Sequence, residues 1–204
     1  LTSLLPPLLQ AHNLRVASLS LDDLYLPHAH LTSLARSHPH NALLHGRGQP
    51  GTHDLPLGLA CLRALRAGEG VDLPVFEKAL FGGEGDRSGE VVRVEGRVEV
   101  VIFEGWMTGF GSLGEEEVRR RYEVARGDPG KAGEELGYEK PFFLEHRVED
   151  VVWVDRALGE YRELWGMLDC FVQLKPVKMN YVWEWRQEVR PLLRVDWERA
   201  DKAG

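Results

Sequence analysis

A chain of 204 residues, 43% of them hydrophobic, is long enough to bury a continuous apolar core, and we expect a single domain over residues 1–204. Its formal net charge of -7 argues against a broad electrostatic contact with nucleic acid, which requires clustered Lys and Arg. No apolar run approaches membrane-spanning length, so no membrane partner is expected. Two cysteines, Cys61 and Cys170, are too few for a disulfide framework; they are typical of a reducing compartment and predict a cytoplasmic protein.

The first predicted strand covers residues 14–21, which are mostly apolar and lead into two acids, Asp22 and Asp23. This pattern is typical of a buried parallel strand, which would present both carboxylates at its carboxyl end. The stretch that follows is predicted to be a loop. Asp54 is then predicted to cap a helix that ends at Gly68 and returns the chain across the sheet.

A second acid is predicted at the end of another strand. Residues 71–87 are expected to be extended, and the alternation of residues 91–100 around Glu95 and Gly96 predicts a hairpin. The hairpin leads into residues 98–104, a β-branched run that ends on Glu104.

The second half of the chain predicts further elements. Residues 109–140 are charged and Gly-rich, which indicates a surface segment with a short helix. Apolar residues at spacings of three and four from Val151 to Leu168 predict one long amphipathic helix. Residues 170–174 predict a third apolar strand, and 179–190 a Trp-rich helix. Strands that alternate with helices in this way predict an α/β fold with a mainly parallel sheet.

Ligands of open parallel sheets bind beyond the carboxyl ends of the strands, where Asp22, Asp23 and Glu104 are expected. Two acids from separate strands suit a magnesium-dependent reaction, in which one deprotonates a hydroxyl and the other holds the hydrated ion. Taken alone, an acid at a strand end is more often a capping or solvated group, and that alternative stays open.

Cationic side chains accompany two glycine-rich loops. Residues 45–54 contain three glycines and a proline beside Arg47 and His53, a composition that can offer cations and amides to an anion. Lys78 and Arg87 form a second cationic pair beside flexible backbone. An ordinary turn and a solvated surface are the alternatives.

Seven of the eight histidines fall between His12 and His53, a density that raises the question of a zinc site. Ligand spacing without an accompanying set of cysteines or carboxylates is a weak indication of zinc. Solvated loop histidines are therefore favoured over a histidine-rich metal module.

Six segments together resemble the glycerate kinase family, including its fungal ATP-binding kinases, and the resemblance covers most of residues 14–188. They are SLDDLY (20–25), NALL (41–44), GRGQPGTHD (46–54), GEGDR (83–87), FEGWMTGF (103–110) and YVWEWR (181–186). The family is similar to the uridine kinase and phosphoribulokinase branch of P-loop kinases. The resemblance therefore implies a P-loop NTPase-like three-layer αβα fold.

The resemblance also implies a reaction: ATP and Mg²⁺ support transfer of the γ-phosphoryl group to a small alcohol. D-glycerate is the first candidate acceptor, while pantothenate, uridine or another sugar acid stays open. By the same resemblance, Asp22 takes the proton from the acceptor hydroxyl, Glu104 and Asp22 act with magnesium, and Arg186 contacts the transferring phosphate. Acceptor or phosphate binding is implied for six further residues: Asp23, Tyr25, Arg47, His53, Lys78 and Arg87.

The sequence departs from this family at its amino end. A Gly-x-x-x-x-Gly-Lys-Ser/Thr loop should precede the helix that leads to the first acidic strand, whereas the chain opens at Leu1 within that helix. GGEG at 82–85 lacks the Lys-Ser/Thr ending. We therefore expect the chain to be truncated at its amino end, and we expect this segment alone to be inactive. A second truncation, at the carboxyl end after Arg190, is considered as well. The alternative is a non-catalytic regulatory protein that has lost its nucleotide loop. A monomer is slightly favoured.

Overall fold

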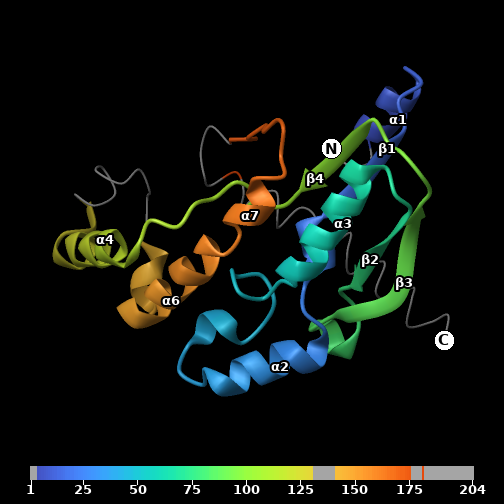
Figure 1. The fold of residues 1–204 in the computed structure, drawn as a ribbon. Coiled ribbons are helices and arrows are strands. Elements are labelled where there is room, and N and C mark those ends of the chain that lie inside the picture. Colours follow the sequence, from blue (N-terminus) through green and yellow to red (C-terminus); the bar gives the residue numbers. More distant parts are fainter. Residues whose placement is uncertain (1–3, 131–140, 176–180, 182–204) are drawn as a thin grey trace. The chain divides into compact units, whose positions relative to one another are not determined.

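The computed structural model describes residues 4–130, 141–175 and 181, and the chain divides into two units, residues 1–169 and 170–204. The first unit contains α1 (Leu5–Gln10), β1 (Val16–Ser20), α2 (His28–Ser37), α3 (Leu55–Ala67), β2 (Val71–Glu77), β3 (Asp86–Val94), β4 (Val100–Glu104), α4 (Glu115–Gly127), α6 (Val148–Gly159) and α7 (Arg162–Trp165) (Figure 1). Short 3₁₀-helices lie at Leu21–Leu24, Ala42–Leu44, Phe81–Gly83 and Phe142–Glu145.

The two predicted acidic strands pair with each other. β1 and β4 are parallel, with a register that runs from Val16 opposite Val100 to Ser20 opposite Glu104. The α/β prediction is thus confirmed, and both strands end at the same edge of their sheet. The 3₁₀-helix Leu21–Leu24 begins directly after β1 and carries Asp22 and Asp23 at that edge.

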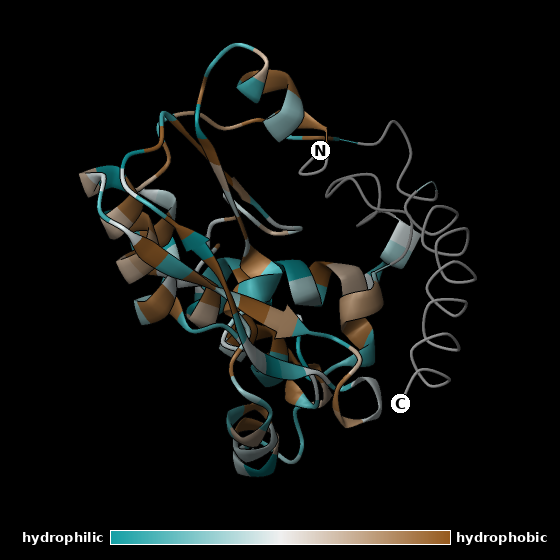
Figure 2. Ribbon diagram, turned by 90° about the vertical axis from the view of Figure 1, so that its right-hand side faces the viewer, coloured by the Kyte–Doolittle hydropathy of each residue, from teal (hydrophilic) through white to brown (hydrophobic). Residues whose placement is uncertain are grey.

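A hydrophobic core forms between the parallel pair and α3. Leu19 of β1 is 1% exposed, and Cys61, Leu62 and Leu65 of α3 pack in the same cluster. In Figure 2 the strands carry hydrophobic residues, in brown, beside hydrophilic ones, in teal. The helix begins where the sequence predicts, because the Asp54 carboxylate accepts the Leu57 N–H (3.1 Å).

The predicted hairpin around Glu95 and Gly96 is wrong. β3 instead pairs with β2 in an antiparallel ladder that runs from Val71 opposite Val94 to Glu77 opposite Asp86. The alternating pattern of residues 91–94 is therefore satisfied by an earlier strand. Gly96, with φ +64°, lies in the connection from β3 to β4.

Helix α2 occupies part of the stretch that was predicted to be a loop. The residue before this helix, Pro27, provides no side-chain cap. The His28 N–H donates instead to the carboxylate of Asp86, 58 residues away (2.8 Å). Leu31 is its buried apolar residue, so the amphipathic pattern is weak as well. A helix whose stabilising contacts are tertiary leaves little local signal in the sequence.

The single long helix predicted from Val151 to Leu168 is divided into α6 and α7. The division falls at Glu160 and Tyr161, and the Tyr161 side chain is fully buried. The spacing of apolar residues continues across the break because both helices pack on the same core.

Two predicted elements lie in the second unit. Residues 170–174 form no strand in the structure, and Val172 is 80% exposed. An apolar run needs a pairing partner to become a strand, and no described strand pairs with it. The predicted helix over 179–190, including Arg186, lies outside the described residues apart from Tyr181.

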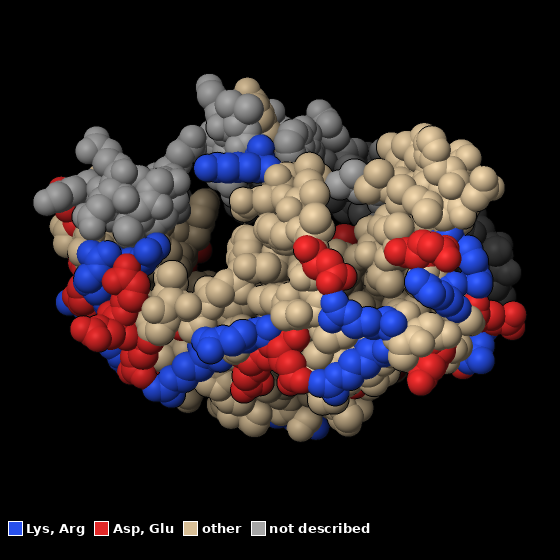
Figure 3. Space-filling view, turned by 45° about the horizontal axis from the view of Figure 1, so that its top comes forward, with Lys and Arg blue, Asp and Glu red and all other residues tan. Residues whose placement is uncertain are grey.

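Acidic and basic side chains are interspersed on the face of the molecule shown in Figure 3. Helix α4 illustrates the pattern, with Glu117 bound by Arg120 and Arg121 (both 2.7 Å). These pairs are exposed and each contributes little to stability. Among the residues that the structure describes, every helix is too short or too polar to span a lipid bilayer.

Candidate active site at the carboxyl ends of β1 and β4

The Asp22 carboxylate is held from two sides. The Tyr25 hydroxyl donates to its Oδ1 (3.0 Å), and the Lys78 ammonium donates to its Oδ2 (2.6 Å). The backbone N–H of Asp22 donates to Ser20 Oγ (3.2 Å) at the end of β1. Lys78 follows directly after β2, so a local turn and a distant strand together fix this carboxylate. The half-exposed Lys78 nevertheless keeps the ion pair open to solvent.

Glu104 lies beside this turn, opposite Ser20 in the strand register. Its side chain is exposed, and no described residue forms a hydrogen bond or an ion pair with its carboxylate. The chain after Glu104 approaches the chain after β1 closely: a Cβ on Gly105 would lie 2.6 Å from Leu21 Cβ. In the same segment, Thr108 is 7% exposed, and its hydroxyl has no hydrogen-bond partner among the described residues.

Asp23 faces a different neighbour from Asp22. Its Oδ1 accepts the Phe76 N–H (3.2 Å), which ties the turn after β1 to β2. Burial raises the pKa of the Asp23 carboxyl, and the hydrogen bond from Phe76 opposes that rise. The contact positions the strand that precedes Lys78.

Tyr25 and His53 are joined by backbone pairing as well as by their rings. The backbone of Leu26 donates to Thr52 (2.9 Å), that of Asp54 donates to Leu24 (2.7 Å), and the rings stack at 4.5 Å. The loop over residues 45–54 is thereby attached to the acidic turn.

The His53 ring is 5% exposed, and its Nδ1 lies 2.6 Å from the hydroxyl oxygen of Tyr161. Burial lowers the pKa of His53 from 6.5 to about 4, and the charge of Asp22 opposes this shift. The imidazole is therefore neutral near neutral pH.

This lowered pKa predicts an acid-sensitive contribution to stability. Between pH 6.5 and about 4 the unfolded chain binds a proton at His53 that the folded chain excludes, so stability falls as the pH falls. We expect a loss of about 2–3 kcal/mol from this residue between about pH 7 and about pH 4.5. Urea unfolding of the wild type and His53→Gln at both pH values measures it. His12→Gln, at an exposed position, is the control; equal pH dependence in the wild type and His53→Gln would contradict the prediction.

The two predicted arginines are both engaged with the protein. Arg47 donates to the carbonyl of Gly83 (2.7 Å) and its guanidinium lies 5.7 Å from the centroid of the Phe76 ring. Arg87 donates from Nη2 to Asp54 Oδ2 (2.9 Å), and its buried Nε has no partner among the described residues. Asp54 thus serves both as the cap of α3 and as the anchor of Arg87.

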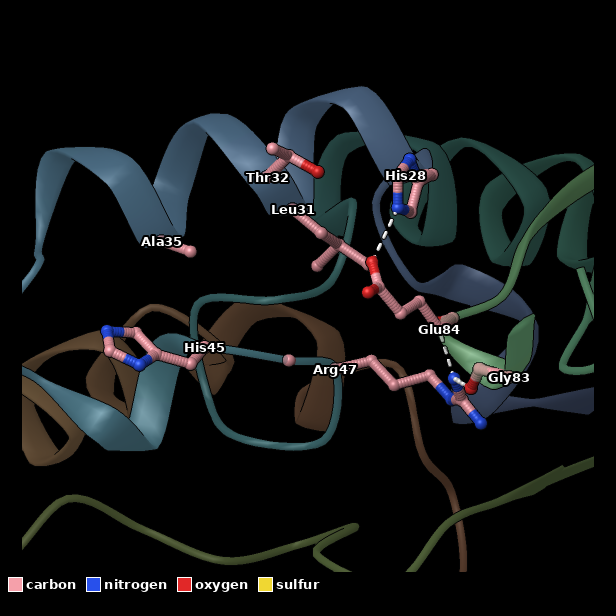
Figure 4. A pocket seen from close by; sticks show the side chains of 9 residues that line it. His28, Leu31, Thr32, Ala35, His45, Arg47, Gly83 and Glu84 are labelled. Carbon is pink, nitrogen blue, oxygen red and sulfur yellow. Dashed lines mark hydrogen bonds and ion pairs between the residues drawn. The ribbon is translucent and has the colours of Figure 1, made fainter. Parts of the chain in front are cut away.

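A pocket of about 450 Å³ lies beside Arg47. Figure 4 shows α2 along one side and the segments of His45 to Arg47 and Gly83 to Glu84 along the other. His28 and Glu84 close one end with a 2.6 Å contact. Contacts through Arg47, Phe76 and Tyr25 connect this pocket to Asp22.

Gly51 holds the loop against α6. Its φ is +93°, a Cβ there would lie 2.7 Å from the Trp153 ring, and its N–H donates to the Tyr161 hydroxyl (3.1 Å). Gly51→Ala is therefore expected to lower the free energy of unfolding by about 1–3 kcal/mol. Gly46→Ala, with open space around its Cβ, should cost less than about 0.5 kcal/mol in the same urea titration. Equal effects would contradict the assigned strain.

The structure brings most of the predicted site residues into one chain of contacts. Asp22 contacts Lys78 and Tyr25, and Tyr25 stacks on His53. The Arg47 guanidinium lies over the Phe76 ring, which packs against Tyr25. Arg87 binds the carboxylate of Asp54, the residue that follows His53. Glu104 lies at the end of the neighbouring strand. Two of the clustered histidines contact different side chains: His28 contacts Glu84, and His38 lies against Trp153.

Two buried polar side chains of this region were not singled out as site residues from the sequence. Tyr161 lies in an apolar helical stripe, which indicates a core residue and hides its hydroxyl contacts. Thr108 lies within the FEGWMTGF segment, and that segment is the sequence signal for this residue.

Comparisons with known proteins agree with these features. The chain is 33% identical over 200 residues to an uncharacterized kinase of Schizosaccharomyces pombe, and this match covers 96% of the chain. It is 30% identical over 187 residues to the chloroplastic D-glycerate 3-kinase of Arabidopsis thaliana, and this match covers 88% of the chain. A solved structure of D-glycerate 3-kinase from Cryptococcus neoformans is 41% identical and superposes with a TM-score of 0.86 over 96% of the chain. No protein-family model matches the sequence.

The relatives are longer than the part that this chain matches. The chain spans 66% of the S. pombe protein, 35% of the Arabidopsis protein and 66% of the Cryptococcus structure. Within that part the similarity extends over nearly the whole chain, in both sequence and fold. The chain therefore belongs to the glycerate kinase family.

Proposed function

We propose that the protein is an ATP-dependent kinase that transfers the γ-phosphoryl group to a hydroxyl of D-glycerate. Relatives described as D-glycerate 3-kinases, at 30% and 41% identity, support this acceptor. The kinase names of the relatives favour an enzyme over a non-catalytic protein that has lost its nucleotide loop.

The observation that carries the proposal is the Asp22 carboxylate at the shared edge of β1 and β4, held by Tyr25 and Lys78. A carboxylate fixed from two sides can align a hydroxyl and accept its proton while the oxygen attacks the phosphorus. We assign Asp22 as the general base. Lys78 would move from Asp22 toward the acceptor, since the exposed ion pair is weak.

An acceptor that carries a carboxylate requires donors around it. We assign Lys78, Arg47 and Arg87 as its cationic contacts and His53 as a neutral one, with Tyr25 orienting Asp22. Asp23 is assigned a supporting role, because its carboxylate holds the backbone of β2. The assignment of Arg186 to the transferring phosphate is based on the YVWEWR segment.

Glu104 and Asp22 fit a magnesium ion by their chemistry, because Mg²⁺ prefers carboxylate oxygens and retains several waters. The exposed Glu104 carboxylate, without a partner among the described residues, supports its assignment as a ligand. Bound Mg²⁺ would neutralise charge on the phosphoryl oxygens during transfer.

The experiment is a coupled ATP-consumption assay with D-glycerate, pantothenate, uridine and other sugar acids as acceptors. Because the relatives are longer, the assay uses both this chain and the longest open reading frame that contains it. ADP release that depends on D-glycerate, with phosphoglycerate identified by ³¹P NMR, is expected from at least one form. ATP consumption with none of these acceptors, from protein shown to be folded, would contradict the proposal.

A further inference from the structure

The hydroxyl of Tyr161 and the ring of His53 form a buried pair whose protons can be assigned. Tyr161 is fully buried, its oxygen accepts the Gly51 N–H (3.1 Å), and it lies 2.6 Å from His53 Nδ1. The hydroxyl proton needs an acceptor, and His53 Nδ1 is the acceptor available among its described partners. The opposite arrangement would leave a buried phenolic proton without a partner, which is costly.

If Nδ1 accepts this proton, a neutral imidazole carries its own proton on Nε2. Burial keeps both groups neutral near pH 7, because it lowers the pKa of His53 to about 4 and raises the pKa of Tyr161 above its usual range. Tyr161 therefore selects one tautomer of His53. Stacking on Tyr25 at 4.5 Å fixes the plane of the ring.

The Nε2 atom of His53 is buried and has no hydrogen-bond partner among the described residues. Buried donors of native proteins are nearly always satisfied, so an orphan of this kind calls for a partner from outside the chain, either a water molecule or a ligand atom. The ring contacts Tyr25, whose hydroxyl binds Asp22, and the charge of Asp22 acts on His53 itself. The orphan donor thus belongs to the region assigned to the acceptor.

We propose that Tyr161 is a positioning residue that holds His53 as a neutral Nε2–H donor for an oxygen of the phosphate acceptor. This inference rests on the proposed kinase function and assigns two of its specificity-determining groups. A neutral donor binds the acceptor oxygen without adding a cation that would compete with Lys78 for Asp22. Protonation of His53 would remove this selection, because both ring nitrogens would then be donors.

The test uses ¹⁵N-histidine NMR of the protein, with the His53 resonances identified by their loss in His53→Gln. In the wild type we expect the Nε2–H tautomer near neutral pH. Tyr161→Phe should shift the Nδ1 and Nε2 resonances toward a mixture of tautomers and weaken D-glycerate binding by about 10-fold. Tyr122→Phe is the matched control, since that hydroxyl donates to the His146 carbonyl (2.8 Å) outside the site, and should change neither.

The outcomes separate this inference from the kinase proposal. An Nδ1–H tautomer in the wild type, a measurement that needs no variant to fold, would overturn the role of Tyr161 whether or not the protein is a kinase. If D-glycerate shifts the side-chain ¹⁵N resonance of Lys78 in a second sample labelled with ¹⁵N-lysine but leaves Nε2 of His53 unchanged, the donor role is overturned and the kinase proposal stands. No effect of D-glycerate on either residue would overturn the donor role and contradict the assigned acceptor together.

Discussion

With D-glycerate as the proposed acceptor, Asp22→Asn is expected to lower kcat for phosphoryl transfer by about 10²–10⁴-fold, the usual contribution of a general base. The amide keeps the shape of the carboxylate and can still accept the Tyr25 hydroxyl, but it cannot take a proton from the acceptor. The lost ion pair with Lys78 is exposed, so little stability should be lost with it. Steady-state kinetics give kcat, and titration with a fluorescent ATP analogue should show affinity changed by less than about twofold.

Asp72→Asn is the matched control for this variant. Asp72 lies in β2, and its ion pair with Arg93 (2.9 Å) is half-exposed and is not part of the Asp22 contacts. Its substitution should leave kcat within about twofold of the wild type. An Asp22→Asn protein with normal turnover would refute the assignment of the general base.

Asp155→Ala is expected to lower the free energy of unfolding by about 3 kcal/mol. The Asp155 carboxylate, on α6, accepts the Ser112 hydroxyl (2.7 Å), the Leu113 N–H (2.7 Å) and the Gly114 N–H (3.0 Å). The residue is 8% exposed, so alanine would leave donors poorly hydrated. The bonds also fix the segment between β4 and α4, which begins just after Glu104. Urea unfolding followed by circular dichroism measures the change.

Two variants control the Asp155 experiment. Asp155→Asn keeps an oxygen acceptor for the backbone donors and should lose less stability than the alanine variant. Asp169→Ala removes an exposed partner of Arg66 and should cost less than about 0.5 kcal/mol. If Asp155→Ala were no more damaging than Asp169→Ala, the three hydrogen bonds would not be a significant source of stability.

Local patterns in the sequence were sufficient for the parts of the fold that depend on near neighbours. The apolar run before Asp22 and the β-branched run before Glu104 predicted the two parallel strands, because a buried strand needs apolar side chains along its length. Asp54 and Gly68 predicted the ends of α3, since caps act within one helical turn. The family resemblance then predicted the set of site residues around Asp22.

The pairing of distant segments could be decided only by the tertiary structure. The partner of β3, the cap of α2 by Asp86 and the contact of Lys78 with Asp22 each join residues far apart in sequence. The same holds for Tyr161: its position on an apolar helical stripe predicted a core side chain, and only folding brings its hydroxyl to His53. Sequence alone determined which residues could carry this chemistry. Long-range packing decided which of them meet, because hydrogen bonds between distant segments leave no periodic pattern along the chain.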